Sequence, residues 1–128
     1  NVMQGKFTDI VENGRPIKVI FGLKEDSEYD YDTEVNPGND MLEAVIDDWM
    51  SKNAYKGNYH SQGVTKLSLI YDQVRIPLRD EKDKNFSPNR FAQQIVKFCN
   101  SLSPTDNAAA KMKAERNVRG GTIYINFK

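Results

Sequence analysis

The sequence predicts one α+β domain that spans residues 1–128, and three observations support this fold class. Apolar residues alternate with polar ones in several short runs, as they do in half-buried strands. Two longer stretches place apolar residues at helical spacing behind residues that cap helices. The chain length is the usual size of one domain, and no stretch resembles an interdomain linker.

The first 39 residues predict a β-hairpin followed by an acidic loop. The hairpin has residues 6–12 as its first strand, Asn13-Gly14 as a type I′ turn and residues 15–23 as its return strand. The return strand carries apolar side chains on alternate residues, so they share one face. Residues 25–39 then form a loop, because acidic side chains crowd it and Asn36-Pro37-Gly38 is typical turn sequence.

Two helices have clear start signals, and a third is expected near the end of the chain. The first covers residues 40–53, with Asp40 as its N-cap and an apolar stripe behind it. The second begins at Ser87-Pro88, where serine caps the helix and proline takes its first position, and it ends before Pro104. Residues 107–116 are expected to form the third helix, with an exposed basic face.

Two more strands are expected between the first two helices. Residues 59–63 are interpreted as a polar connector, and residues 64–71 and 74–79 as strands that pair around a turn at Asp72-Gln73. Pro77 has no N–H to donate to a sheet, so its strand is expected at a sheet edge or at a bulge.

The expected element order is therefore ββα-ββ-αα-β, with residues 80–85 as a charged loop and residues 122–128 as the last strand. Runs of strands between helices favour an antiparallel or mixed sheet with the helices packed on one side. This order does not match a βαβ dinucleotide-binding fold.

The composition favours a domain of a reducing compartment that recognises partners through local charge. A lone cysteine cannot form an internal disulfide, which favours a cytoplasmic location. No apolar run approaches the roughly 20 residues of a membrane-spanning helix, so no membrane partner is expected. The total charge is zero, but residues 1–50 carry −8, residues 51–83 carry +2 and residues 84–128 carry +6. Local potential of this kind steers charged partners.

The sequence contains no motif for a cofactor or a metal, and none is expected. It lacks the glycine-rich nucleotide-binding patterns, and a single histidine and a single cysteine are too few for a zinc site. His60 is interpreted as an exposed histidine or, alternatively, as a general base. Cys99 follows a helical apolar stripe and is interpreted as a core residue. A small nuclease or toxin-like enzyme would use His60 as its base. Arg75, Arg79 or Lys66 would then hold a phosphate.

An acidic stretch is the first candidate binding segment. Its acidic residues are Glu25, Asp26, Glu28, Asp30, Asp32 and Glu34. Alternating carboxylates are suitable ligands for Ca²⁺, but the required glycine and glutamate of an EF-hand loop are missing at the sixth and twelfth positions. The stretch is therefore a solvated loop, a segment that engages a basic surface of a partner protein, or a Ca²⁺ site that does not follow the EF-hand pattern.

A basic segment near the C-terminus is the second candidate. Its proposed nucleic-acid contacts are Lys111, Lys113, Arg116, Arg119 and, from the preceding helix, Arg90. The order helix, basic turn, strand resembles the last helix and wing of a winged-helix DNA-binding domain over about residues 88–128. That resemblance implies a turn at Gly120-Gly121 that approaches a phosphate backbone, where Lys and Arg release counterions. The alternative is an amphipathic helix with a solvated basic face.

The leading functional hypothesis is a non-enzymatic nucleic-acid-binding accessory module. Tyr124 on the last strand either stacks on a base or covers the second face of the sheet. The alternatives are a protein-binding adaptor or inhibitor acting through the acidic stretch, the small enzyme with His60, and a structural subunit whose exposed edge strand pairs with another chain.

Overall fold

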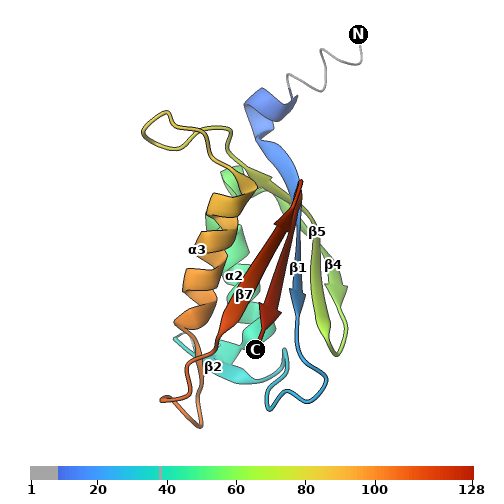
Figure 1. Ribbon diagram of the computed structural model, residues 1–128, viewed down its shortest axis with the longest axis vertical. Helices are drawn as coiled ribbons and strands as arrows, with labels where there is room; N and C mark the ends of the chain where they lie inside the picture. The colour runs from blue at the N-terminus through green and yellow to red at the C-terminus, as the bar shows by residue number, and fades with distance from the viewer. Residues whose placement is uncertain (1–8, 38) are drawn as a thin grey trace.

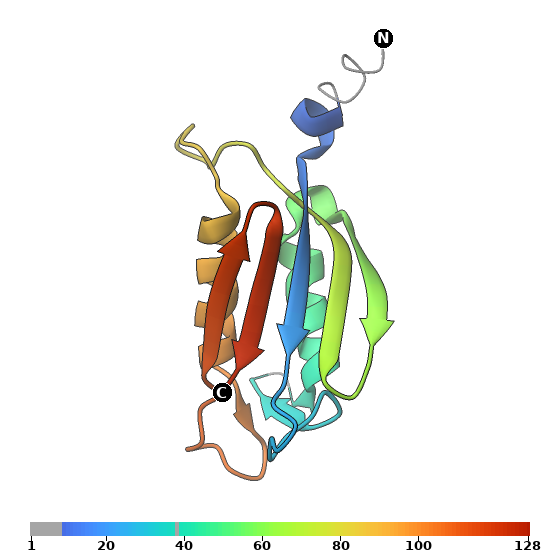
Figure 2. The same cartoon turned by 45° about the vertical axis from the view of Figure 1, so that its right-hand side comes forward.

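The computed structural model describes residues 9–37 and 39–128 as a five-stranded sheet with two helices on one face (Figure 1). The strand order is β4-β5-β1-β8-β7. These strands are β1 (Arg15–Gly22), β4 (Tyr59–Val64), β5 (Ser68–Ile76), β7 (Ala114–Arg119) and β8 (Thr122–Phe127). The helices are α2 (Leu42–Asn53) and α3 (Pro88–Asn100). In the turned view the sheet lies in front of both helices, and no described element covers its other face (Figure 2).

Shorter elements complete the domain at the two ends of the helices. A three-stranded sheet has the order β3-β2-β6, formed by Asp40–Met41, Glu34–Asn36 and Ser103–Pro104. A 3₁₀ turn, η1 (Tyr55–Gly57), follows α2, and residues 9–13 are helical.

The predicted fold class is confirmed: the domain is α+β, with a mixed sheet and its helices on one side. The central strand β1 pairs antiparallel with β5 and parallel with β8, whereas the outer pairs are antiparallel. The predicted alternation in β1 is also confirmed, because Ile17, Val19 and Phe21 are all buried. They face the apolar stripes of both helices, which include Ile46 and Ile95.

Two partly buried hydrogen bonds to one carboxylate connect α2 to the sheet. Tyr71 of β5 is only 1% exposed, and its hydroxyl donates to Asp47 Oδ1 of α2 at 3.2 Å. The hydroxyl of Tyr59 in β4 donates to the other carboxylate oxygen at 3.0 Å. Burial, followed by the Asp47 charge, raises the pKa of Tyr71, so its hydroxyl stays protonated as a donor.

The predicted N-terminal hairpin is wrong within the described residues. Residues 9–13 are helical, and Gly14 ends this turn with φ +87° while its N–H donates to Ile10 O at 3.0 Å. A left-handed glycine after a helix is a common C-terminal cap, so Asn13-Gly14 is a helix end and not a hairpin turn. The part of the predicted first strand at residues 6–8 lies outside the described residues.

The predicted hairpin around Asp72-Gln73 is also wrong. Residues 68–76 form one strand, and the predicted polar connector at residues 59–63 is its hairpin partner, β4. Asp72-Gln73 is a bulge, because Val19 pairs with Tyr71 while Ile17 pairs with Val74. Pro77 follows the last residue of this interior strand, so it occupies neither an edge nor the bulge.

The predicted third helix does not exist. Residues 107–113 are turns and coil, and β7 occupies residues 114–119, where it pairs residue by residue with β8. The resemblance to a winged helix fails for the same reason, because the helix that would precede the basic turn is a sheet strand. Residues 108–110 are alanines, which favour a helix, but they are exposed and bury no apolar stripe, and short helices are unstable without such packing.

The helix start signals were right at α3 and wrong at α2. Ser87 caps α3, since its hydroxyl oxygen accepts from the Arg90 N–H at 3.2 Å. The N-cap of α2 is Met41 and not Asp40, whose carboxylate instead accepts from the Met41 N–H at 2.8 Å. In the part of the chain that the structure describes, no helix is long and apolar enough to cross a membrane.

Candidate functional site

The five predicted nucleic-acid contacts do not form one surface. Lys111 and Lys113 precede β7, and Arg119 ends it, so the length of the strand separates them. Arg116 and Arg119 point to opposite faces of the sheet, because Arg116 pairs with buried Ile125 and Arg119 with Thr122. Each arginine therefore belongs to a different candidate surface.

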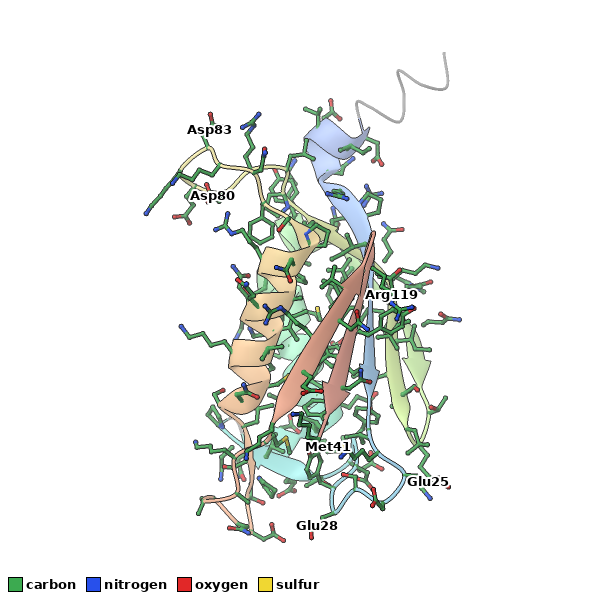
Figure 3. All side chains as sticks on the ribbon, in the orientation of Figure 1. Glu25, Glu28, Met41, Asp80, Asp83 and Arg119 are labelled. Atoms are coloured by element: carbon green, nitrogen blue, oxygen red, sulfur yellow. The ribbon has the colours of Figure 1, made fainter. Side chains whose placement is uncertain are left out.

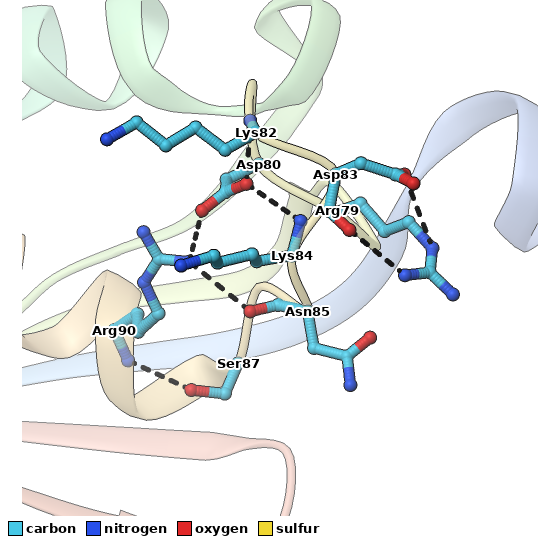
Figure 4. Close-up of polar contacts among 8 residues, drawn as sticks. All are labelled: Arg79, Asp80, Lys82, Asp83, Lys84, Asn85, Ser87 and Arg90. Carbon is cyan, nitrogen blue, oxygen red and sulfur yellow. Dashed lines mark hydrogen bonds and ion pairs between the residues drawn. The ribbon is translucent and has the colours of Figure 1, made fainter.

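Arg90 lies in a third place, in the first turn of α3, beside a loop organised by one carboxylate (Figure 4). Asp80 Oδ1 accepts from the N–H groups of Lys82 and Lys84 at 2.9 Å each, and its Oδ2 accepts from Arg90 Nη1 at 2.8 Å. The Lys84 N–H, the Arg90 guanidinium and the Lys82 N–H hold the pKa of Asp80 at about 2. Arg90 also lies over the Phe86 ring at 5.1 Å, so it stabilises this loop. The charged loop predicted at residues 80–85 is confirmed.

The acidic stretch lies beside Lys111 and Lys113 of the basic segment, at the opposite end of the molecule from this loop. In Figure 3, Glu25 and Glu28 lie at one end and Asp80 and Asp83 at the other. A pocket of about 560 Å³ is lined by residues of both segments, among them Glu28 and Lys111. The neighbouring opposite charges weaken each other's long-range field. The acidic side chains of the stretch are Glu25, Asp26, Glu28, Asp30, Asp32 and Glu34; Glu34 begins β2, and the other five precede it.

The residues of the enzyme hypothesis are also dispersed. His60 of β4 is exposed, and its Nδ1 lies 2.7 Å from Asp72 Oδ1, a partner that the sequence did not reveal. Arg75 binds Asp9 at 3.0 Å, and Arg79 contacts Asp83 in the charged loop. Lys66 lies in the turn between β4 and β5. The hypothesis of a small enzyme has no support from this arrangement and stays a prediction.

Cys99 is a core residue, as predicted. Its side chain is buried in α3, and burial raises the pKa of the thiol to about 12. Within residues 9–37 and 39–128, no cluster of three or more His, Cys, Asp or Glu side chains is placed to hold a metal ion.

One edge of the sheet combines free backbone groups with a groove. β7 is the last strand of the sheet order, and a two-residue turn at Gly120-Gly121 joins it to β8. In such a hairpin the residues that flank the turn exchange backbone hydrogen bonds, and the bonding alternates from there. Arg119, Asn117 and Glu115 therefore bond to β8, whereas Arg116 and Val118 direct their N–H and C=O groups outward.

Two observed contacts agree with this register. The Lys128 N–H donates to Lys113 O at 2.8 Å, which continues the series that bonds to β8. The Ala114 N–H, of the outward series, donates to Asn100 Oδ1 of α3 at 2.9 Å. No described residue is a backbone hydrogen-bond partner for the outward groups of Arg116 and Val118.

A groove of about 770 Å³ runs between this edge and α3. Half-buried Val96, Ala114 and Val118 give it an apolar floor. Asn89 and Arg116 form its polar wall, and Arg116 Nε donates to Asn89 Oδ1 at 3.1 Å. An extended segment that pairs with β7 would place alternate side chains in this groove.

The opposite edge strand, β4, is built differently. Its pairing with β5 shifts at His60/Ser61 and again at Ser61/Gly63, and Gly63 has φ +140°. Bulges and irregular pairing protect sheet edges from further strands. β7 pairs with β8 through all six residues without a shift, so it is the regular edge that can accept another strand.

A comparison with models of protein families assigns the chain to a family. Residues 15–128 match the model described as a domain of unknown function, DUF6175. The chain belongs to the DUF6175 family. Comparisons with curated proteins and with solved structures gave no match. The description of the DUF6175 family names no activity, ligand or partner.

Sequence reasoning missed the edge of this DUF6175 domain, although a signal was present. Met112, Ala114 and Val118 lie at even positions with polar residues between them, which is strand periodicity and not helical spacing. The charged residue Arg116 interrupts the series on the same face. Because Arg116 was assigned to a helix, the groove that it lines was not predicted.

Proposed function

We propose that the domain is a non-enzymatic binding module that captures an extended peptide segment of a partner protein as an additional strand along β7. The observation that carries this proposal is the outward backbone of Arg116 and Val118 beside the groove against α3. In strand addition, backbone hydrogen bonds supply affinity and pockets for alternate side chains supply specificity. Both components are available at this edge.

A pair of substitutions at one position tests the mode of binding. Val118→Pro removes the outward N–H, and proline is tolerated in an edge strand where its missing donor faces away from the sheet. Val118→Ala keeps the N–H and removes only part of the apolar floor of the groove. The probe is a peptide selected on the immobilised domain from a displayed library of random sequences about 12 residues long.

We expect Val118→Pro to weaken binding of the selected peptide at least tenfold and Val118→Ala only a few-fold, by isothermal titration with circular dichroism as the folding control. Equal affinities for the two variants, or a library that yields no binder, would reject the proposal. Light scattering tests whether a second copy of the chain occupies the edge. A dimer that Val118→Pro dissociates would assign the edge to self-association and not to a peptide of a partner.

Nucleic-acid binding is the second candidate, on a different surface from the one that the sequence suggested. On the open sheet face, Arg119 and Lys18 lie on either side of Thr122, and Tyr124 is 36% exposed in the next row. Cations beside an exposed aromatic ring are a combination that binds single strands through phosphates and base stacking. This geometry favours single-stranded over duplex nucleic acid.

Fluorescence anisotropy with a labelled single-stranded oligothymidine at two salt concentrations tests this candidate. Binding that falls steeply with salt and is lost in the double variant Arg119→Ala, Tyr124→Ala supports it. Absence of binding at low salt removes it. The matched control is Arg116→Ala, which removes an arginine of the same strand from the helix-covered face.

A further inference from the structure

We infer that the β7 groove selects peptides with a carboxylate and an apolar side chain two residues apart, and that Arg116 binds the carboxylate. This inference rests on the proposed strand addition and names the class of peptide that it favours. Arg116 projects to the helix side of the sheet, the side on which the groove lies.

The guanidinium of Arg116 is held in place but not neutralised. Its Nε donates to Asn89 Oδ1 at 3.1 Å, which orients the planar group along the groove wall. Across residues 9–37 and 39–128, its Nη1 and Nη2 make no hydrogen bond, and no carboxylate forms an ion pair with it. A planar guanidinium presents two parallel N–H groups, which match the two oxygens of a carboxylate.

The neighbouring acid does not compete for this arginine. Glu115 is adjacent in sequence but alternates to the open face of the sheet, where it pairs with Asn126. The Lys128 ammonium forms an ion pair with the Glu115 carboxylate. Arg90, by contrast, is already paired with Asp80. Of the arginines in α3 and β7, Arg116 is therefore the one whose charge remains available beside the groove.

The apolar floor sets the second requirement. Val118 lies two residues from Arg116 on the same face, and Val96 of α3 faces the same groove. Successive side chains of an added strand alternate between faces, so the peptide residues opposite Arg116 and Val118 are also two apart. A carboxylate and an apolar side chain at positions i and i+2, in either order, fit both requirements.

The test combines two protein variants with matched peptides. The selected peptide is synthesised in three forms: unchanged, with its acidic side chain replaced by the amide, and with its C-terminal carboxylate amidated. Each is titrated against the full chain, against Arg116→Gln and against the control Arg119→Gln, which removes an arginine from the same strand on the other face. The two modified peptides distinguish a side-chain carboxylate from a terminal one.

We expect Arg116→Gln to weaken binding of the carboxylate peptide about tenfold to a hundredfold and to leave one of the amide forms unaffected. Arg119→Gln should bind all three peptides as the unchanged chain does. Equal losses in both arginine variants, or equal binding of all three peptides to the unchanged chain, would overturn the carboxylate requirement. Val118→Pro distinguishes the two proposals. If Val118→Pro loses binding and Arg116→Gln does not, strand addition is supported and only the carboxylate requirement is rejected.

Discussion

At the scale of single residues, a few positions admit only one side chain because the backbone dictates it. Gly14 is buried and left-handed, with φ +87°. A Cβ atom there would lie 2.6 Å from Ile76 O and 2.9 Å from Tyr55 Cδ2. The backbone oxygen belongs to a core strand and cannot move without disturbing β5.

Gly14→Ala should therefore destabilise the domain by at least about 2 kcal/mol, because a left-handed alanine and a clash with the backbone act together. Urea unfolding monitored by circular dichroism measures this loss. Gly121→Ala is the control, since a Cβ atom at Gly121 meets nothing within 4 Å. Comparable losses in the two variants would contradict the importance of the close approach.

Asp80 is the residue whose charge state should matter most for local order. Its pKa in the folded chain, about 2, lies below the ordinary value of 3.8, so the ionised form stabilises the folded loop. That contribution is complete above pH 3.8 and disappears as pH falls through about 2. NMR titration of the Lys82 and Lys84 amides should give a midpoint near 2. A midpoint near 3.8 would show that the carboxylate does not hold the loop.

At the scale of elements, side-chain periodicity predicted most of the fold where one period ran without interruption. The alternation in β1, the last strand at β8 and the capped helix α3 were predicted correctly. The prediction failed in β5, where the alternation of buried side chains changes its phase. In β5 the buried residues change from odd positions, Leu69 and Tyr71, to even positions, Val74 and Ile76. This change was interpreted as a turn, but a bulge achieves it within one strand.

The bulge interpretation makes a specific prediction about deletions in β5. Deleting Gln73 restores simple alternation, so Tyr71, Val74 and Ile76 keep their inward direction and the domain should still unfold cooperatively. Deleting Ile70, outside the bulge, puts Leu69 out of phase with Tyr71 and should cost at least about 2 kcal/mol. Thermal unfolding of both variants checks this. A Gln73 deletion that is as destabilised as the Ile70 deletion would contradict it.

At the scale of the whole molecule, folding brings the acidic and basic ends of the sequence together. Glu28, Lys111 and Lys113 line one pocket, whereas Arg116 and Arg119 lie on opposite faces of the sheet, so the +6 charge of residues 84–128 does not form one basic face. Charge patterning along the chain therefore did not predict the candidate site. The groove at β7 arises from sheet order and backbone register, which depend on contacts between distant segments. Local sequence patterns do not contain that information.

Amide hydrogen exchange, measured by NMR on the free chain and on its complex with the selected peptide, tests the central claim most directly. The Arg116 and Val118 amides point away from the sheet and should exchange rapidly in the free chain, whereas the Asn117 amide bonds to β8 and should be protected. Peptide binding should slow exchange at Arg116 and Val118 and leave Asn117 unchanged. Rapid exchange at Arg116 and Val118 in the complex would show that the peptide does not bind as a strand along β7.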